Sequence, residues 1–145
     1  MLIVNEIFYS IQGEGRLAGV PSVFIRLAGC PLRCRWCDTK YAWKKEQGVE
    51  TETEPAADEI LKFDCSHVVI TGGEPMVQQE GLAELTQILK SEGRHLTIET
   101  SGICYVPRVK CDLMSISPKL SNSLPKTTGD RRKHEQEAIN LSVLS

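Results

Sequence analysis

The fold is decided by a stretch in the middle of the chain, Val68–Val69–Ile70–Thr71–Gly72–Gly73–Glu74–Pro75. It joins a short β-branched run to a pair of glycines that ends it, which is typical of a buried strand in a parallel sheet. Four further apolar runs of this kind lie at residues 2–9, 23–28, 96–99 and 113–116. Helical spacing appears between them, at residues 56–62 and again at 82–89 before Gly93. This alternation predicts an α/β fold built on a parallel sheet.

Length and charge narrow the class of protein. The 145 residues are enough for one domain, which we expect to cover residues 1–145. Seventeen basic residues against 19 acidic ones argue against a nucleic-acid binder. No apolar run reaches the roughly 18 residues that a membrane span needs. The first residues also lack the basic and long apolar parts of a signal peptide, so we expect a cytoplasmic protein with reduced thiols.

Two segments are less regular. Residues 44–54 are polar and charged, which predicts a solvated loop. The last residues are ambiguous: Ile139, Leu141 and Val143 alternate like a strand, whereas Ala138, Leu141 and Leu144 fit a helix. The sequence alone does not decide between them.

Polar residues gather where the predicted strands end, at residues 26–30, 71–75, 99–102 and 117–119. In parallel α/β folds, ligands bind outside the carboxyl ends of the strands. The sequence therefore predicts a binding site at this edge of the sheet.

Three cysteines with the spacing C-x3-C-x2-C, namely Cys30, Cys34 and Cys37, follow the second predicted strand. One loop can wrap three thiolates around a single metal centre. A 4Fe–4S cluster held this way keeps one iron open for another ligand, whereas a zinc site needs a fourth protein ligand. The alternative to the cluster is therefore a zinc site completed by Cys65 or His67.

This cysteine loop resembles that of the radical S-adenosylmethionine (SAM) enzymes. In that superfamily the open iron chelates the methionine part of SAM, and electron transfer releases a 5′-deoxyadenosyl radical. The glycine-rich strand end with a carboxylate, a second superfamily feature, is matched by Gly72–Gly73–Glu74–Pro75. The resemblance implies a 4Fe–4S cluster and SAM as cofactors, and Glu74 as a candidate to hold the SAM ammonium.

Within the superfamily, the chain resembles the 7-carboxy-7-deazaguanine synthases of queuosine and other 7-deazapurine pathways. The matching motifs lie at residues 6–15, 23–27, 37–39, 71–75, 98–102 and 117–119. The resemblance implies a partial TIM-type barrel of parallel strands. It also implies a ring-contracting lyase that converts 6-carboxy-5,6,7,8-tetrahydropterin to 7-carboxy-7-deazaguanine.

Site residues follow from this resemblance motif by motif. Arg26 would form a bidentate pair with a carboxylate, and Thr39 would be a ligand of Mg²⁺. The expected substrate-binding residues are Ile11, Gln12, Gly13, Glu14, Arg26 and Thr71. The expected SAM-binding residues are Trp36, Cys37, Asp38, Gly73, Glu74, Glu99, Ser117, Pro118 and Lys119. Cys65, Cys104 and Cys111 match no cluster position and are interpreted as packing residues.

Relatives continue for many tens of residues after the Ser117–Pro118–Lys119 strand end. We therefore expect a radical SAM domain that is short at its C-terminus, with SAM cleavage better supported than pterin capture. The resemblance also implies a homodimer and an electron donor such as flavodoxin or ferredoxin. Two alternatives stay open: a cluster- or zinc-binding fragment without turnover, and another radical SAM enzyme such as a glycyl-radical activase.

Overall fold

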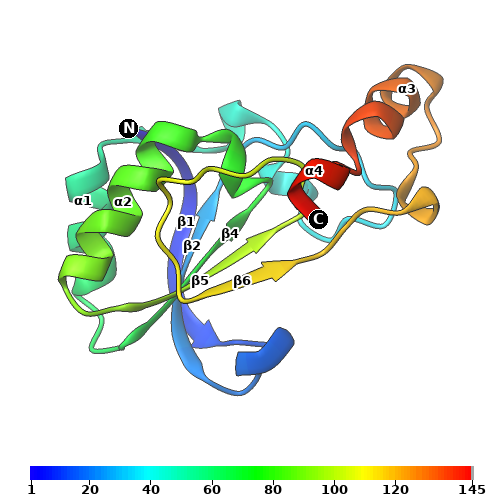
Figure 1. Ribbon diagram of the computed structural model, residues 1–145. Coiled ribbons are helices and arrows are strands. Elements are labelled where there is room, and N and C mark those ends of the chain that lie inside the picture. The colour runs from blue at the N-terminus through cyan, green and yellow to red at the C-terminus, as the bar shows by residue number, and fades with distance from the viewer. Residues whose placement is uncertain (145) are drawn as a thin grey trace.

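A computed structural model describes residues 1–144 and shows one open, twisted sheet of six strands (Figure 1). The strand order across the sheet is β3-β1-β2-β4-β5-β6. The strands are β1 (Leu2–Ile11), β2 (Pro21–Leu27), β3 (Val49–Thr51), β4 (His67–Gly72), β5 (His95–Thr100) and β6 (Leu113–Ile116). The helices are α1 (Thr53–Leu61), α2 (Gln79–Ser91), α3 (Thr128–Glu137) and α4 (Leu141–Leu144). Short 3-10 turns lie at Gly15–Leu17, Lys40–Ala42, Lys45–Gln47, Pro75–Val77 and Ser121–Ser123.

The α/β prediction is confirmed. Strands β2, β4, β5 and β6 run parallel to one another, and each of the five predicted apolar runs forms a strand. The sheet does not close, so its architecture is that of a partial TIM-type barrel. Pro55 lies in the first turn of α1, and Gly93, with φ +71°, follows the C-cap residue Glu92 of α2, in agreement with the predicted helix end.

The prediction of a wholly parallel sheet is wrong at β1, which pairs antiparallel with β2. Nine residues separate Ile11 from Pro21. A parallel crossover needs a dozen or more residues, so this connection is too short for one. Strands β1 and β2 therefore form a long hairpin, and its loop reaches the polar face of the sheet.

The prediction that residues 44–54 form a loop is also wrong in part. Val49–Thr51 forms β3, which pairs antiparallel with residues 2–4 of β1, and α1 already begins at Thr53. The strand is short, and Val49 at its start is 70% exposed. A three-residue edge strand of this kind carries too little apolar pattern to be predicted from sequence.

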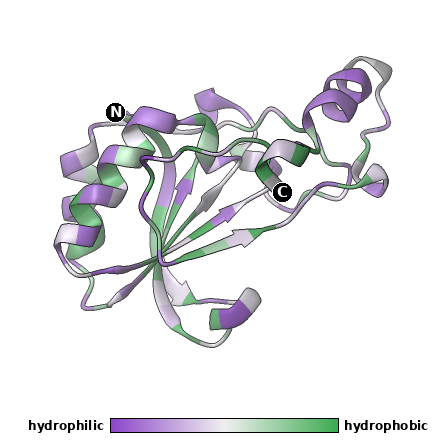
Figure 2. Cartoon of the chain, in the orientation of Figure 1, coloured by the Kyte–Doolittle hydropathy of each residue, from purple (hydrophilic) through white to green (hydrophobic). Residues whose placement is uncertain are grey.

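The hydrophobic core lies between the sheet and helices α1 and α2, which cover one face (Figure 2). Alternate strand residues point into this core, including Val23, Ile25 and Leu27 of β2 and Val68 and Ile70 of β4. The intervening residues point to the opposite face, because side chains alternate along a strand. That opposite face carries the polar groups described below.

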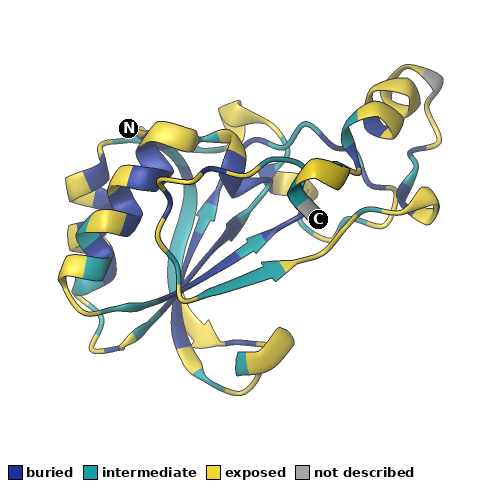
Figure 3. Ribbon diagram, viewed as in Figure 1, coloured by how far each residue is buried: buried dark blue, intermediate teal, exposed yellow. Residues whose placement is uncertain are grey.

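The C-terminal part is helical. Leu141–Leu144 forms α4, which resolves the ambiguity of the last residues in favour of a helix. The polar segment Thr128–Glu137 forms α3, which the sequence did not predict because it has no apolar stripe. Figure 3 shows α3 as a mostly exposed helix at the end of the molecule where the cysteine loop lies.

Candidate active site

A row of polar side chains crosses the open face of the sheet, with one residue from each neighbouring strand. Glu6 pairs with Arg26, Arg26 with Thr71, and Glu99 with Ser115 in the strand register. Thr71 and Glu99 follow the paired residues Ile70 and Ile98, so they occupy the next step of the same row. Since parallel strands bring equivalent positions together, five residues far apart in sequence share one surface.

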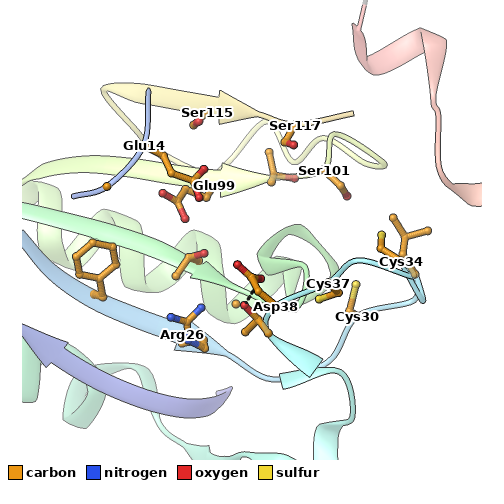
Figure 4. A pocket seen from close by; sticks show the side chains of 18 of the residues that line it. Glu14, Arg26, Cys30, Cys34, Cys37, Asp38, Glu99, Ser101, Ser115 and Ser117 are labelled. Carbon is orange, nitrogen blue, oxygen red and sulfur yellow. Dashed lines mark hydrogen bonds between the residues drawn. The ribbon is translucent and has the colours of Figure 1, made fainter. Parts of the chain in front are cut away.

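Four residues of this row, Arg26, Thr71, Glu99 and Ser115, line a pocket of about 480 Å³ at the carboxyl ends of the parallel strands. The cysteine loop closes one end of it, and Glu14 and Glu99 lie away from the sulfur atoms (Figure 4). The predicted site residues that line the pocket are Ile11, Gln12, Gly13, Glu14, Arg26, Cys30, Cys34, Trp36, Cys37, Asp38, Thr39, Thr71, Gly73, Glu99, Ser117 and Lys119. Of the predicted set, only Glu74 and Pro118 are not among the lining residues.

The three cysteines of the loop are free and line the same pocket. Burial raises the pKa of Cys30 to about 12 and also raises that of Cys34, while the nearby Lys119 opposes the shift at Cys34. Both groups are therefore thiols at neutral pH in the metal-free chain. A bound metal centre reverses this preference because thiolates are its ligands.

Zinc fits this site poorly. Within residues 1–144, no three His, Cys, Asp or Glu side chains converge as ligands of one metal ion would. Cys65 and His67 lie at the amino end of β4, whereas the cysteine loop follows the carboxyl end of β2, which runs parallel to it. A 4Fe–4S cluster needs no such convergence, since each cysteine binds a different iron. Three thiols from one loop fit the cluster with one open iron.

Gly72 and Gly73 allow the end of β4 to pack closely against the backbone that follows β2. A Cβ at Gly72 would overlap the backbone of Leu27, and a Cβ at Gly73 would overlap the carbonyl of Gly29. The Gly72 φ of +136° is also a conformation that L-residues rarely adopt. The glycine pair is therefore required to bring the end of β4 against the start of the cysteine loop.

Glu74 is buried at the end of β4 and is held there by hydrogen bonds. Its side chain is 1% exposed, and its carboxylate accepts hydrogen bonds from Thr100 Oγ1 at 2.6 Å, from Ser101 N at 2.8 Å and from Ser101 Oγ. It also accepts from Met76 N at 3.1 Å. These contacts fix the direction of the Glu74 carboxylate, and its role toward the SAM ammonium stays a prediction. It ties the end of β4 to the end of β5.

Arg26 lies between Glu6 and Thr71 in the polar row, with 16% of its side chain exposed. Its Nε donates to Glu6 Oε1 at 2.7 Å, and the guanidinium lies 5.7 Å from the ring centre of Phe8 and 5.6 Å from that of Tyr41. Tyr41 OH also contacts Glu6 Oε1 at 3.2 Å. Glu6 and the two rings fix the direction of the guanidinium, whose terminal nitrogens remain available to a ligand in the pocket.

The β1–β2 hairpin loop is held over the pocket by a side-chain contact. Gln12 Nε2 donates to Glu99 Oε1 at 2.8 Å, and the Glu14 amide donates to Gln12 Oε1 at 3.2 Å. Gln12 is only 4% exposed, so this contact is part of the fold as well as of the pocket wall. It brings residues 11–14 to the same site as Glu99, as the sequence predicted.

The rim of the pocket carries the remaining predicted residues. Thr39 Oγ1 donates to Asp38 Oδ1 at 2.8 Å. Lys119 Nζ donates to Ser117 Oγ at 2.8 Å and lies 5.3 Å from the ring centre of Trp36. The Lys119 ammonium thus links the residues after β6 to Trp36 in the cysteine loop.

Sequence reasoning missed several lining residues, chiefly Phe8, Phe24 and Ser115. Ser115 could have been found, because it is the one polar residue of its strand and lies opposite Glu99. The rings of Phe8 and Phe24 are stacked, with their centres 5.1 Å apart. From the sequence alone, both residues would be interpreted as part of the hydrophobic core. Only the strand register shows that the pair faces the pocket.

Comparison with known proteins decides the family. The model of the Radical SAM superfamily matches residues 24–137. The chain belongs to the radical SAM superfamily. Membership implies a 4Fe–4S cluster and SAM as cofactors, and the pocket at the cysteine loop has the donors for both. Within residues 1–144, no helix is long and apolar enough to cross a membrane.

Individual relatives of this radical SAM chain share one name. A 7-carboxy-7-deazaguanine synthase of Rhodopirellula baltica is 48% identical over 124 residues, covering 86% of this chain and 48% of the relative. The synthase of Escherichia coli K12 is 37% identical over 138 residues, covering 81% and 61%. The crystal structure of QueE from Escherichia coli superposes with a TM-score of 0.67 at 37% identity, covering 83% of this chain and 60% of that one. The chain thus spans about half to three fifths of the length of these relatives.

Proposed function

We propose that this chain carries the radical SAM site of a 7-carboxy-7-deazaguanine synthase, the lyase that contracts the ring of 6-carboxy-5,6,7,8-tetrahydropterin. The observation that carries the proposal is that the cysteine loop and the polar row from Arg26 to Ser115 line one pocket. The relatives described above are named as synthases and not as glycyl-radical activases. The synthase is therefore the reaction we propose, over the activase and over a fragment without turnover.

In this proposal Cys30, Cys34 and Cys37 hold the 4Fe–4S cluster. When bound, the reduced cluster supplies the electron that cleaves the sulfonium of SAM. The surrounding residues exclude water and fix the direction of the reacting groups. Leu32 and Ile103 pack with the cysteines in one small hydrophobic cluster.

SAM would lie between the cysteine loop and the ends of β4, β5 and β6. Gly73 precedes Glu74 in the chain, and the Ser101 hydroxyl donates to the Glu74 carboxylate. Gly73, Glu74 and Ser101 would contact the methionine part. The Glu99 carboxylate would accept from the ribose hydroxyls. Trp36, Asp38, Ser117 and Lys119 would surround the adenine, with Pro118 fixing the backbone at the rim.

The pterin would lie over the polar row, under the hairpin loop. Arg26 would pair with its carboxylate, since a guanidinium whose Nε is already held by Glu6 presents its terminal nitrogens in a fixed direction. Thr71 and the residues Ile11, Gln12, Gly13 and Glu14 would bind the polar edge of the ring. This arrangement places the carboxylate at the middle of the pocket.

The substrate assignment is tested by replacing Arg26 with lysine. We expect the KM for the pterin to rise about 10- to 100-fold, the loss typical of a charge-assisted hydrogen-bond pair. The measurement is steady-state formation of 7-carboxy-7-deazaguanine, followed by chromatography. Arg108, exposed and outside the pocket, gives the matched control Arg108→Lys, whose KM should equal that of the unmodified chain. An unchanged KM in Arg26→Lys would show that the carboxylate binds elsewhere.

We further propose that Thr39 is a ligand of Mg²⁺, with substrate oxygens and water completing the octahedron. The support is its position: Thr39 lines the pocket beside Asp38, and both side chains offer hard oxygen donors. Thr39→Ala is expected to lower the stimulation of turnover by Mg²⁺ several-fold while iron content stays constant. Turnover is measured against Mg²⁺ concentration, with Thr51→Ala, far from the pocket on β3, as the control. Full stimulation in Thr39→Ala would remove Thr39 from the magnesium site.

The remaining partners are proposals of the same kind. Reduction of the cluster requires a one-electron donor, for which we propose flavodoxin or ferredoxin. We propose a homodimer and a cytoplasmic location, where the six free cysteines would remain reduced. Sedimentation of the purified chain tests the dimer directly.

A further inference from the structure

Among the side chains of α3 that the structure describes, His134 is the buried one. His134 is 1% exposed, while Asp130, Arg131, Arg132 and Lys133 before it are exposed (Figure 3). An amphipathic helix buries a stripe of apolar residues, and α3 has no such stripe. The polar contacts of His134 therefore help to set where α3 lies.

Those contacts reach the cysteine loop. The backbone amide of Arg33 donates to His134 Nδ1 at 3.2 Å. Since an amide can only donate, Nδ1 accepts and the ring proton is on Nε2, which lies 2.8 Å from Ser123 Oγ. Burial lowers the pKa of His134, which agrees with a neutral ring in this role.

Ser123 continues the connection. Its hydroxyl donates to the Leu120 carbonyl at 2.6 Å, which leaves its lone pairs for His134 Nε2–H. Its own carbonyl accepts from the backbone amide of Arg35 at 3.0 Å. Ser123 is itself fully buried, so neither contact competes with water.

The two connected amides flank a single cysteine. Arg33 precedes Cys34 and Arg35 follows it, and both of their N–H groups end on the His134–Ser123 pair. Cys34 is 6% exposed and packs with Leu32 and with Ala138, the residue directly after α3. The backbone on both sides of Cys34 is thus held from outside the loop, by residues about 90 to 100 positions later in the chain.

We propose that His134, together with Ser123, is a positioning residue pair that sets the place of Cys34 for cluster binding. The pair touches neither SAM nor substrate and acts through the amides of Arg33 and Arg35. The inference rests on the proposed function only in taking Cys34 as a cluster ligand. Mutation of a residue that orients a metal ligand typically lowers metal affinity 10- to 100-fold. We therefore expect replacement of His134 to lower the affinity for the cluster by about 10- to 100-fold.

The first test needs no cluster. In the metal-free chain, the rate of alkylation of each cysteine is followed by peptide mass spectrometry. His134→Ala is expected to raise the rate at Cys34 at least about tenfold while Cys65, buried in the main core, keeps its slow rate. Lys133→Ala, at an exposed neighbouring position of α3, is the matched control and should leave both rates unchanged. An unchanged rate at Cys34 in His134→Ala would overturn the proposal, and a parallel rise at Cys65 would assign His134 to global stability instead.

The second test measures the cluster. After anaerobic reconstitution, iron and sulfide are expected to be lost from His134→Ala at a lower chelator concentration than from the unmodified chain. Ser123→Ala, which keeps the carbonyl for Arg35, should give a smaller loss, and His134→Asn, which keeps an acceptor near Nδ1, should restore part of it. Equal cluster retention in all variants would overturn the proposal. Failure of the unmodified chain to take up a cluster would instead refute the proposed function, while the alkylation rates would still decide the role of His134.

Discussion

The variant Gly72→Ala is expected to lose about 4 kcal/mol of its free energy of unfolding, close to the whole stability of many domains. A Cβ at this position would overlap the amide nitrogen and carbonyl of Leu27 on the paired strand β2. The backbone φ of +136° adds strain for any L-residue. Neither β2 nor the cysteine loop that follows it can move away from Gly72 without breaking the parallel pairing of β2 with β4.

Urea denaturation followed by circular dichroism measures this loss. Gly129→Ala is the control, because a Cβ there meets nothing within 4 Å and alanine favours a helix. We expect the control to match or slightly exceed the unmodified chain in stability. A Gly72→Ala midpoint within error of the unmodified chain would contradict the close packing of β4 against β2.

The variant Cys34→Ala is expected to reduce iron and sulfide after anaerobic reconstitution to background. Two thiolates are too few to hold a cluster that normally takes at least three protein ligands. Iron, zinc and sulfide analysis together with the visible thiolate-to-iron absorbance provide the measurement. Stoichiometric zinc without sulfide in the unmodified chain would favour the zinc alternative.

Cys65→Ala is the matched control for Cys34→Ala. Cys65 is 9% exposed, lies in the main core and donates to the carbonyl of Pro21 at 3.3 Å. Its replacement removes a small packing residue at the amino end of β4, so it should cost some stability but no iron. A loss of iron in Cys65→Ala would place a cluster ligand outside the loop.

Much of the fold and site could be predicted because the signals are local. Each strand of the parallel sheet is a short apolar run, and the residues at the strand ends meet because parallel strands share one edge. For the same reason Arg26, Thr71 and Glu99 were predicted to lie together, and the structure places them in one row. The cysteine spacing and the glycine pair are likewise readable from the chain alone.

The remaining features depend on contacts between distant segments. The direction of β1 follows from the length of its connection to β2, and β3 exists only because residues 2–4 offer it a partner. The hydrogen bonds that hold the Glu74 carboxylate come from Thr100 and Ser101, which lie 26 and 27 positions later in the chain. Nothing in the polar sequence of α3 indicates that His134 reaches the amide of Arg33, 101 positions earlier.

The central claim is that the pocket at the cysteine loop binds and cleaves SAM. The most direct measurement is chromatography of 5′-deoxyadenosine formed by the reconstituted chain with SAM and a strong reductant, without pterin. We expect 5′-deoxyadenosine from the unmodified chain and from Cys65→Ala, and none above background from Cys34→Ala. A chain that carries a full cluster and yet forms no 5′-deoxyadenosine would contradict the claim.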